Sequence, residues 1–147
     1  MGRASRCCRE KLRYGGADDF AAKIRTIEPL LAALDCPTIV VGALGVDRAR
    51  PLVVAAARHA ARLVLVQPDN ERACTVEQLA ALVPADFRGE VVRTTVAELF
   101  PSAATCATQG ATVVVLGSLY LVGEVLARFQ GLAVPTSAWQ DRLPLKP

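Results

Sequence analysis

Short apolar segments alternate with longer segments of helical periodicity along most of this sequence, and that alternation allows few folds. Strands that alternate with helices pair in parallel through right-handed crossovers. The sequence therefore predicts a three-layer α/β, Rossmann-like domain with a mainly parallel sheet. The predicted strands cover 38–41, 63–66, 91–94 and 112–116. The predicted helices cover 20–34 with a kink or restart at Pro29, 51–61, 75–83, 96–108 with a break at Pro101, and a last one that reaches Phe129.

The last predicted strand leads into the most informative local pattern of the chain. The residues of Thr112–Leu116 are all β-branched except the last, and none is charged. This pattern predicts a strand buried on both faces. Gly117 allows a sharp turn, and Ser118 stands where a helix would begin. The serine hydroxyl can accept a hydrogen bond from the first N–H groups of that helix. A strand, a turn of small residues and a helix N-terminus together form a potential anion site.

The octet Gly-Ser-Leu-Tyr-Leu-Val-Gly-Glu at 117–124 resembles the closing motif of the folylpolyglutamate synthase/dihydrofolate synthase family, ATP-dependent amide ligases of the Mur ligase superfamily. The resemblance extends back through the predicted strands and covers 14–129, which corresponds only to the last domain of such an enzyme. We therefore divide the chain into a basic leader (1–13), a Rossmann-like domain of the Mur-ligase C-terminal type (14–130) and an extended, proline-containing tail (131–147).

The resemblance also implies which residues would meet a ligand. Ser118, Tyr120 and Asp18 fall at positions that it associates with glutamate, the co-substrate of the family. Asp19 follows a further strand that the family would have at 10–13, and Asp47 follows the strand predicted at 38–41; both are the corresponding nucleotide-binding candidates. Loops after parallel strands meet at one edge of the sheet, where ligands of such folds bind. No catalytic or metal-ligating residue is predicted.

The first of these loops departs from the family's Asp-Gly-Ala-His-Asn-Pro pattern. Gly16 and Ala17 match it, but Asp18 replaces the histidine and Asp19 replaces the asparagine. A carboxylate beside the phosphates and carboxylates of the family's ligands is repulsive unless a metal intervenes. The second loop contains Val46-Asp47-Arg48 where the family tends to carry Asp-Lys-Asp.

The sequence also lacks the Gly-x-x-x-x-Gly-Lys-Ser/Thr loop that holds ATP phosphates, which in this superfamily belongs to a central domain. We therefore expect a domain that presents glutamate for addition to folates and is inactive alone. Either an ATP-binding ligase domain acts with it in trans and brings ATP and Mg²⁺, or the chain is a truncated or diverged copy of such a domain. The alternative is a non-catalytic interaction or scaffold module that kept the fold and lost the site. A small nucleotide-binding regulator is a third hypothesis.

Composition narrows the remaining classes of function. The net charge of +3 is small and dispersed, and no apolar run reaches the ~20 residues of a membrane span, so we expect neither nucleic acid nor a membrane as partner. The five cysteines have no Cys-x-x-Cys spacing and the chain has a single histidine. This usage predicts reduced thiols, no zinc site and a cytoplasmic location.

Each candidate residue also has a purely structural interpretation. Ser118 can be a plain N-cap worth ~1 kcal/mol, and Asp47 can cap the helix that follows it. Tyr120 can place its ring against the sheet edge, while Glu124 can pair with Arg128 at i,i+4 spacing. Independently of any function, the segment that begins at Thr75 has the spacing of a capping box.

Overall fold

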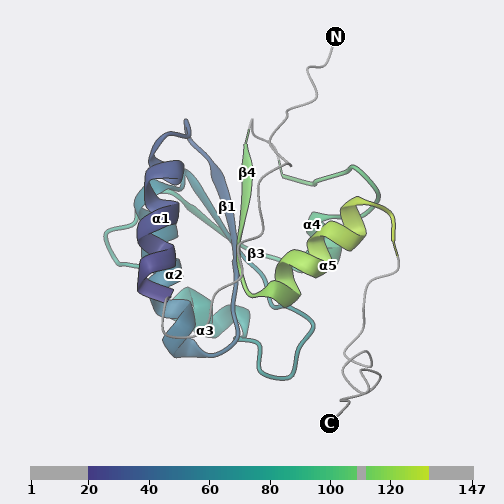
Figure 1. The fold of residues 1–147 in the computed structure, drawn as a ribbon, viewed down its shortest axis with the longest axis horizontal. Helices are drawn as coiled ribbons and strands as arrows, with labels where there is room; N and C mark the ends of the chain where they lie inside the picture. Colours follow the sequence, from purple (N-terminus) through teal and green to yellow (C-terminus); the bar gives the residue numbers. More distant parts are fainter. Residues whose placement is uncertain (1–19, 109–111, 133–147) are drawn as a thin grey trace.

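The computed structural model describes residues 20–108 and 112–132, which form one sheet with helices on both faces (Figure 1). The four strands of this part are all parallel and lie in the order β3-β2-β1-β4. The predicted three-layer, Rossmann-like α/β fold is confirmed. Its elements are α1 (Phe20–Ala32), β1 (Thr38–Gly42), α2 (Val46–His59), β2 (Arg62–Leu65), α3 (Val76–Ala81), β3 (Glu90–Arg93), α4 (Val96–Leu99), β4 (Val113–Gly117) and α5 (Leu119–Phe129).

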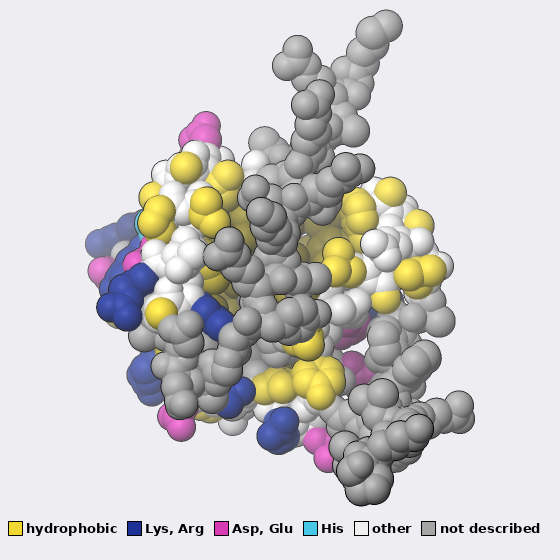
Figure 2. Space-filling model, in the orientation of Figure 1, with side chains coloured by type: hydrophobic (Ala, Val, Ile, Leu, Met, Phe, Trp, Pro, Cys, Tyr) yellow, Lys and Arg dark blue, Asp and Glu magenta, His cyan; other side chains and the backbone are white. Residues whose placement is uncertain are grey.

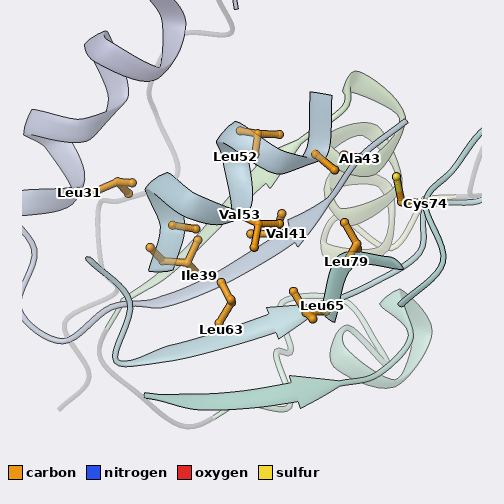
Figure 3. Packing of buried hydrophobic residues seen from close by; sticks show 12 residues of the cluster. Leu31, Ile39, Val41, Ala43, Leu52, Val53, Leu63, Leu65, Cys74 and Leu79 are labelled. Carbon is orange, nitrogen blue, oxygen red and sulfur yellow. The ribbon is translucent and has the colours of Figure 1, made fainter. Parts of the chain in front are cut away.

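The strands divide their side chains between two cores, one on each face of the sheet. Alternate residues of a strand point to opposite faces, so odd-numbered and even-numbered residues of β1 and β2 enter different clusters. One cluster faces α1, α2 and α3 and includes Ile39, Val41, Leu63 and Leu65 (Figure 3). The other faces α4 and α5 and includes Val40, Val64, Leu121 and Val125.

The strand β4 is less buried than the sequence predicted. Its residues Val113–Leu116 are half-buried instead of buried on both faces. Within the described part of the chain β4 pairs only with β1, so it forms an edge of the sheet. The strand β1 is buried at every residue because β2 and β4 flank it.

Hydrogen-bonding side chains explain where α3 and α4 begin. The Thr75 hydroxyl accepts from the Gln78 N–H at 3.1 Å, and the Gln78 side chain accepts from the Thr75 N–H at 3.0 Å, which confirms the predicted capping box. A second capping box joins Thr95 and Glu98 at the start of α4. The same spacing was visible in the sequence but was not recognised there.

The structure corrects parts of two predictions about prolines. The helix α1 continues through Pro29 without a restart, and the Ala33 N–H still bonds to the Pro29 carbonyl at 3.3 Å. The predicted break at Pro101 is confirmed, because α4 stops at Leu99, but no helix continues beyond it to the predicted end at residue 108. A residue before proline is disfavoured in the helical region, and Phe100, before Pro101, adopts φ −122° and ψ 74°.

The α4 cap makes a pH-dependent contribution to stability. The Thr94 hydroxyl (2.8 Å) and the Thr95 N–H (3.2 Å) donate to Glu98 and hold the pKa of its carboxyl below the usual value. A carboxyl with a lowered pKa stabilises the folded chain above its unfolded pKa, and that contribution is lost as the pH falls through the folded pKa. We expect Glu98→Gln, which keeps the cap, to lose less stability than the native chain between about pH 7 and about pH 3. Urea denaturation at each pH measures this, and equal losses would contradict it.

None of the helices in residues 20–108 and 112–132 combines the length and the apolar character that a bilayer span requires.

Candidate functional site

Successive strands are added to the sheet on one side of β1 and then on the other, so a topological switch point lies between β1 and β4. From β1 the chain moves outward through α2 to β2 and β3, then returns to β4 on the other side of β1. The helices α2 and α5 therefore leave the carboxyl ends of two neighbouring strands on opposite faces of the sheet (Figure 1). In sheets of this kind, such a switch point is where ligands bind. The loops predicted to carry Ser118 and Asp47 both begin here.

Two glycines face each other at the switch point because the backbones of β1 and β4 approach closely. Gly42 and Gly117 are partners in the register, and the Ser118 N–H bonds to the Gly42 carbonyl at 3.2 Å. A Cβ atom on Gly117 would lie 1.8 Å from that carbonyl oxygen, and one on Gly42 would lie 2.8 Å from the Val66 oxygen. Both positions therefore require glycine. The sequence predicted the turn at Gly117 but not its contact with Gly42.

Ser118 is the N-cap of α5, as its position in the sequence predicted. Its hydroxyl oxygen accepts from the Leu121 N–H at 3.3 Å in a partly buried setting. The hydroxyl hydrogen remains available to donate, and the free N–H groups of a first helical turn give this end a partial positive charge. The same geometry thus serves a cap and suits an anionic ligand.

Of the other candidate residues, Asp47 belongs to α2 on one face of the sheet and Tyr120 to α5 on the other, and two lie outside the described residues. Asp47 is not the N-cap of α2, because Gly45 takes that place with φ 83°, a region that favours glycine. Asp47 lies exposed in the first turn of α2, where its charge complements the helix dipole. Tyr120 is 41% exposed in the first turn of α5. Asp18 and Asp19 lie outside the described residues.

The loop between β2 and α3 connects the two sides of this edge. The Gly45 N–H donates to the Arg72 carbonyl at 3.1 Å, and the Asp69 N–H donates to the Glu124 carboxylate of α5 at 3.3 Å. Glu124 also lies 3.5 Å from Arg128 Nε, which confirms the predicted ion pair, although the geometry is not that of a hydrogen bond. The contact between Asp69 and Glu124 was missed because it depends on which strands are neighbours.

Neither Cys36 nor Cys74 supplies an activated nucleophile. Burial raises the pKa of the Cys74 thiol, and the hydrogen bond and charge of Asp35 raise the pKa of the Cys36 thiol. A raised pKa leaves less thiolate at neutral pH. Over residues 20–108 and 112–132, no group of three His, Cys, Asp or Glu side chains is arranged to hold a metal ion.

Two exposed apolar side chains lie at the carboxyl edge of the sheet. Val46 in α2 and Leu119 in α5 are 36% and 55% exposed, and each stands in the first turn of its helix beside the switch point. Apolar atoms also reach the surface elsewhere among the charged side chains (Figure 2). The sequence predicted this edge but not the exposure of Val46 and Leu119, because helical periodicity does not say which element a face meets.

A cavity of about 480 Å³ lies at the opposite edge, between the end of α2 and the loop before β3, where Arg58, Phe87 and Arg88 contribute to its lining. It is removed from the switch point, because α2 ends where β2 begins. We place the candidate site at the carboxyl edge instead, since two helix N-termini and Ser118 meet there.

No protein-family model matches this chain, and no curated protein or solved structure matches it either. The octet at 117–124 and the geometry of the switch point therefore carry the argument about function.

Proposed function

We propose that this chain is a glutamate-presenting domain of the folylpolyglutamate synthase/dihydrofolate synthase type that acts with an ATP-binding ligase domain in trans. The observation that carries the proposal is the position of the octet at 117–124. Its glycine closes β4 against β1, its serine caps α5, and both lie at the switch point. A negatively charged amino acid suits the N-terminus of α5 and the Ser118 hydroxyl.

The division of labour between two chains follows from what this chain lacks. Its sequence has no phosphate-binding loop, and its described residues include no trio of metal ligands. ATP and Mg²⁺ would therefore be bound by the partner, in the cytoplasm, and this chain would contribute binding and orientation of glutamate. The exposed Val46 and Leu119 beside the site offer apolar surface against which such a partner could close.

A reconstitution experiment tests this function. The chain is mixed with a candidate ATP-binding ligase domain, and glutamate addition to a folate is measured with and without the chain. We expect turnover only, or much faster, in the mixture. Turnover equal to that of the partner alone removes the proposal.

Substitutions of Ser118 separate binding of glutamate from capping. Ser118→Ala is expected to lower the free energy of unfolding by ~1 kcal/mol, while Ser118→Asp keeps the cap and the stability. In the reconstituted reaction we expect Ser118→Asp to raise the KM for glutamate more than Ser118→Ala does, because its carboxylate repels the substrate. Thr95→Ala removes an equivalent cap from α4 and should leave that KM unchanged. An unchanged KM in Ser118→Asp would reduce Ser118 to a structural cap.

The second candidate function is a non-catalytic interaction module. The observation that favours it is that internal hydrogen bonds already use the Ser118 oxygen and the Gly45 N–H, while the same edge exposes apolar side chains. Under this alternative the chain would bind the partner domain with the same affinity when Ser118 is replaced by Asp, and it would not change the partner's turnover.

A further inference from the structure

We call residues 67–72, which form the loop between β2 and α3, the strap. The end of the strap next to α3 is fixed to the chain before α2 by backbone hydrogen bonds. The Gly45 N–H donates to the Arg72 carbonyl at 3.1 Å, and just after the strap the Cys74 N–H donates to the Ala43 carbonyl at 2.8 Å. These bonds join backbone atoms, so they hold this end of the strap whichever side chains surround it.

The other end of the strap passes beside the switch point and is tied to α5 by a side chain. Pro68 is fully buried, and its Cδ lies 3.1 Å from the position of a Cβ on Gly42. The next residue, Asp69, is exposed, and its N–H donates to the Glu124 carboxylate at 3.3 Å. Glu124 therefore holds the strap against α5 at the carboxyl edge of the sheet.

The Glu124 carboxylate is shared between two donors. One oxygen accepts from the Asp69 N–H at 3.3 Å, and the other lies 3.5 Å from Arg128 Nε, whereas strong charge-assisted bonds measure about 2.7–2.9 Å. The Glu124 side chain is only 11% exposed, and the buried Arg128 Nε makes no hydrogen bond within the described residues. A buried donor without an acceptor costs free energy. Arg128 therefore competes with Asp69 for the same carboxylate.

We propose that Glu124 is a latch with two positions, which closes and opens the strap beside the switch point. In the closed position, which is the one in this structure, the carboxylate holds Asp69. In the open position it turns to Arg128, gives the buried Nε its missing partner and releases the Asp69 N–H to water. The strap then pivots on its fixed end at Arg72. Under the proposed function, on which this consequence alone rests, opening of the strap admits glutamate to Ser118.

Hydrogen exchange of the full chain, without any ligand, tests the latch through the Asp69 amide. Glu124→Ala removes the acceptor, so the protection of this amide should fall at least about threefold. Arg128→Met removes the competing donor and keeps an apolar stem, so the protection should rise at least about threefold. The opposite signs are decisive. If the Glu124–Arg128 pair only stabilised α5, the loss of either partner would lower the protection.

Two controls separate the latch from general loosening of the fold. Glu71→Gln changes an exposed carboxyl in the strap itself and should leave the protection of Asp69 unchanged. The Cys74 amide, which bonds to the backbone at Ala43, should keep its protection in every variant. Arg128→Met carries the test by itself if Glu124→Ala does not fold. Protection of Asp69 that falls or stays the same in Arg128→Met overturns the proposal.

The reconstituted reaction tests the consequence for glutamate separately. Arg128→Met should lower kcat/KM for glutamate at least about threefold, because fewer molecules are open to admit the substrate. An unchanged kcat/KM means that the strap does not control access to Ser118. If the opposite shifts in exchange are found but the mixture shows no turnover above that of the partner alone, the latch stands and the proposed function falls. Turnover without those shifts removes the latch alone.

Discussion

Gly117→Ala is expected to cost at least about 3 kcal/mol of stability and to leave much of the chain unfolded. The added Cβ would lie 1.8 Å from the Gly42 carbonyl oxygen and 2.9 Å from the carbonyl carbon. These are backbone atoms inside the pairing of β1 and β4, so the contact can be relieved only by separating the strands. Denaturation by urea, followed by circular dichroism, measures the effect.

The matched control is Gly123→Ala in the interior of α5. Apart from its own chain neighbours and the nearby backbone of α5, no heavy atom of the described residues lies within 4 Å of a Cβ built on Gly123, so alanine adds no clash with them. Glycine weakens a helix relative to alanine, and the substitution should therefore stabilise the chain by about 0.5–1 kcal/mol. If Gly117→Ala is as stable as the native chain, the close approach of β1 and β4 at the switch point is wrong.

Leu121→Ala is expected to lower the free energy of unfolding by about 2–5 kcal/mol. Leu121 is fully buried in the core that faces α4 and α5. Its Cδ2 lies 3.0 Å from the Cβ positions of both Gly42 and Gly117, so the side chain supports the switch point directly. Its loss would leave a cavity beneath the candidate site.

Leu119→Ala is the control for that substitution, since Leu119 is two residues away and 55% exposed. Its loss should change the stability by less than about 0.5 kcal/mol. The same denaturation measurement serves both variants. Equal costs at the two positions would mean that α5 does not pack on the sheet through Leu121.

Features that depend on neighbouring residues in the chain were predictable. The strand ending at Gly117, the cap at Ser118 and the capping box at Thr75 each follow from a few consecutive side chains and their hydrogen bonds. The Glu124–Arg128 pair is also local, because it spans a single helical turn. For the candidate site, such signals located Ser118 and Tyr120 at the start of one helix.

Features that depend on the neighbours of a strand or helix were not predictable in the same way. Asp47 was expected to be able to cap α2, but Gly45 does so, because the chain enters that helix with a positive φ next to the loop of Arg72. The strand β4 was expected to be buried on both faces, and only the strand order revealed that it is the last of the described strands on its side of the sheet.

The sequence by itself determined that strands alternate with helices, that the sheet is parallel, and that a capped helix follows Gly117. These properties arise from hydrophobic periodicity and local hydrogen bonding, which act over a few residues. Tertiary structure alone decided that β1 and β4 meet through facing glycines, that β2 and β3 lie on the other side of β1, and that Val113–Leu116 of β4 are only half-buried. The reason is that strand order is set by how whole layers pack. Apolar periodicity is nearly the same in every strand, so it does not encode which strands become neighbours.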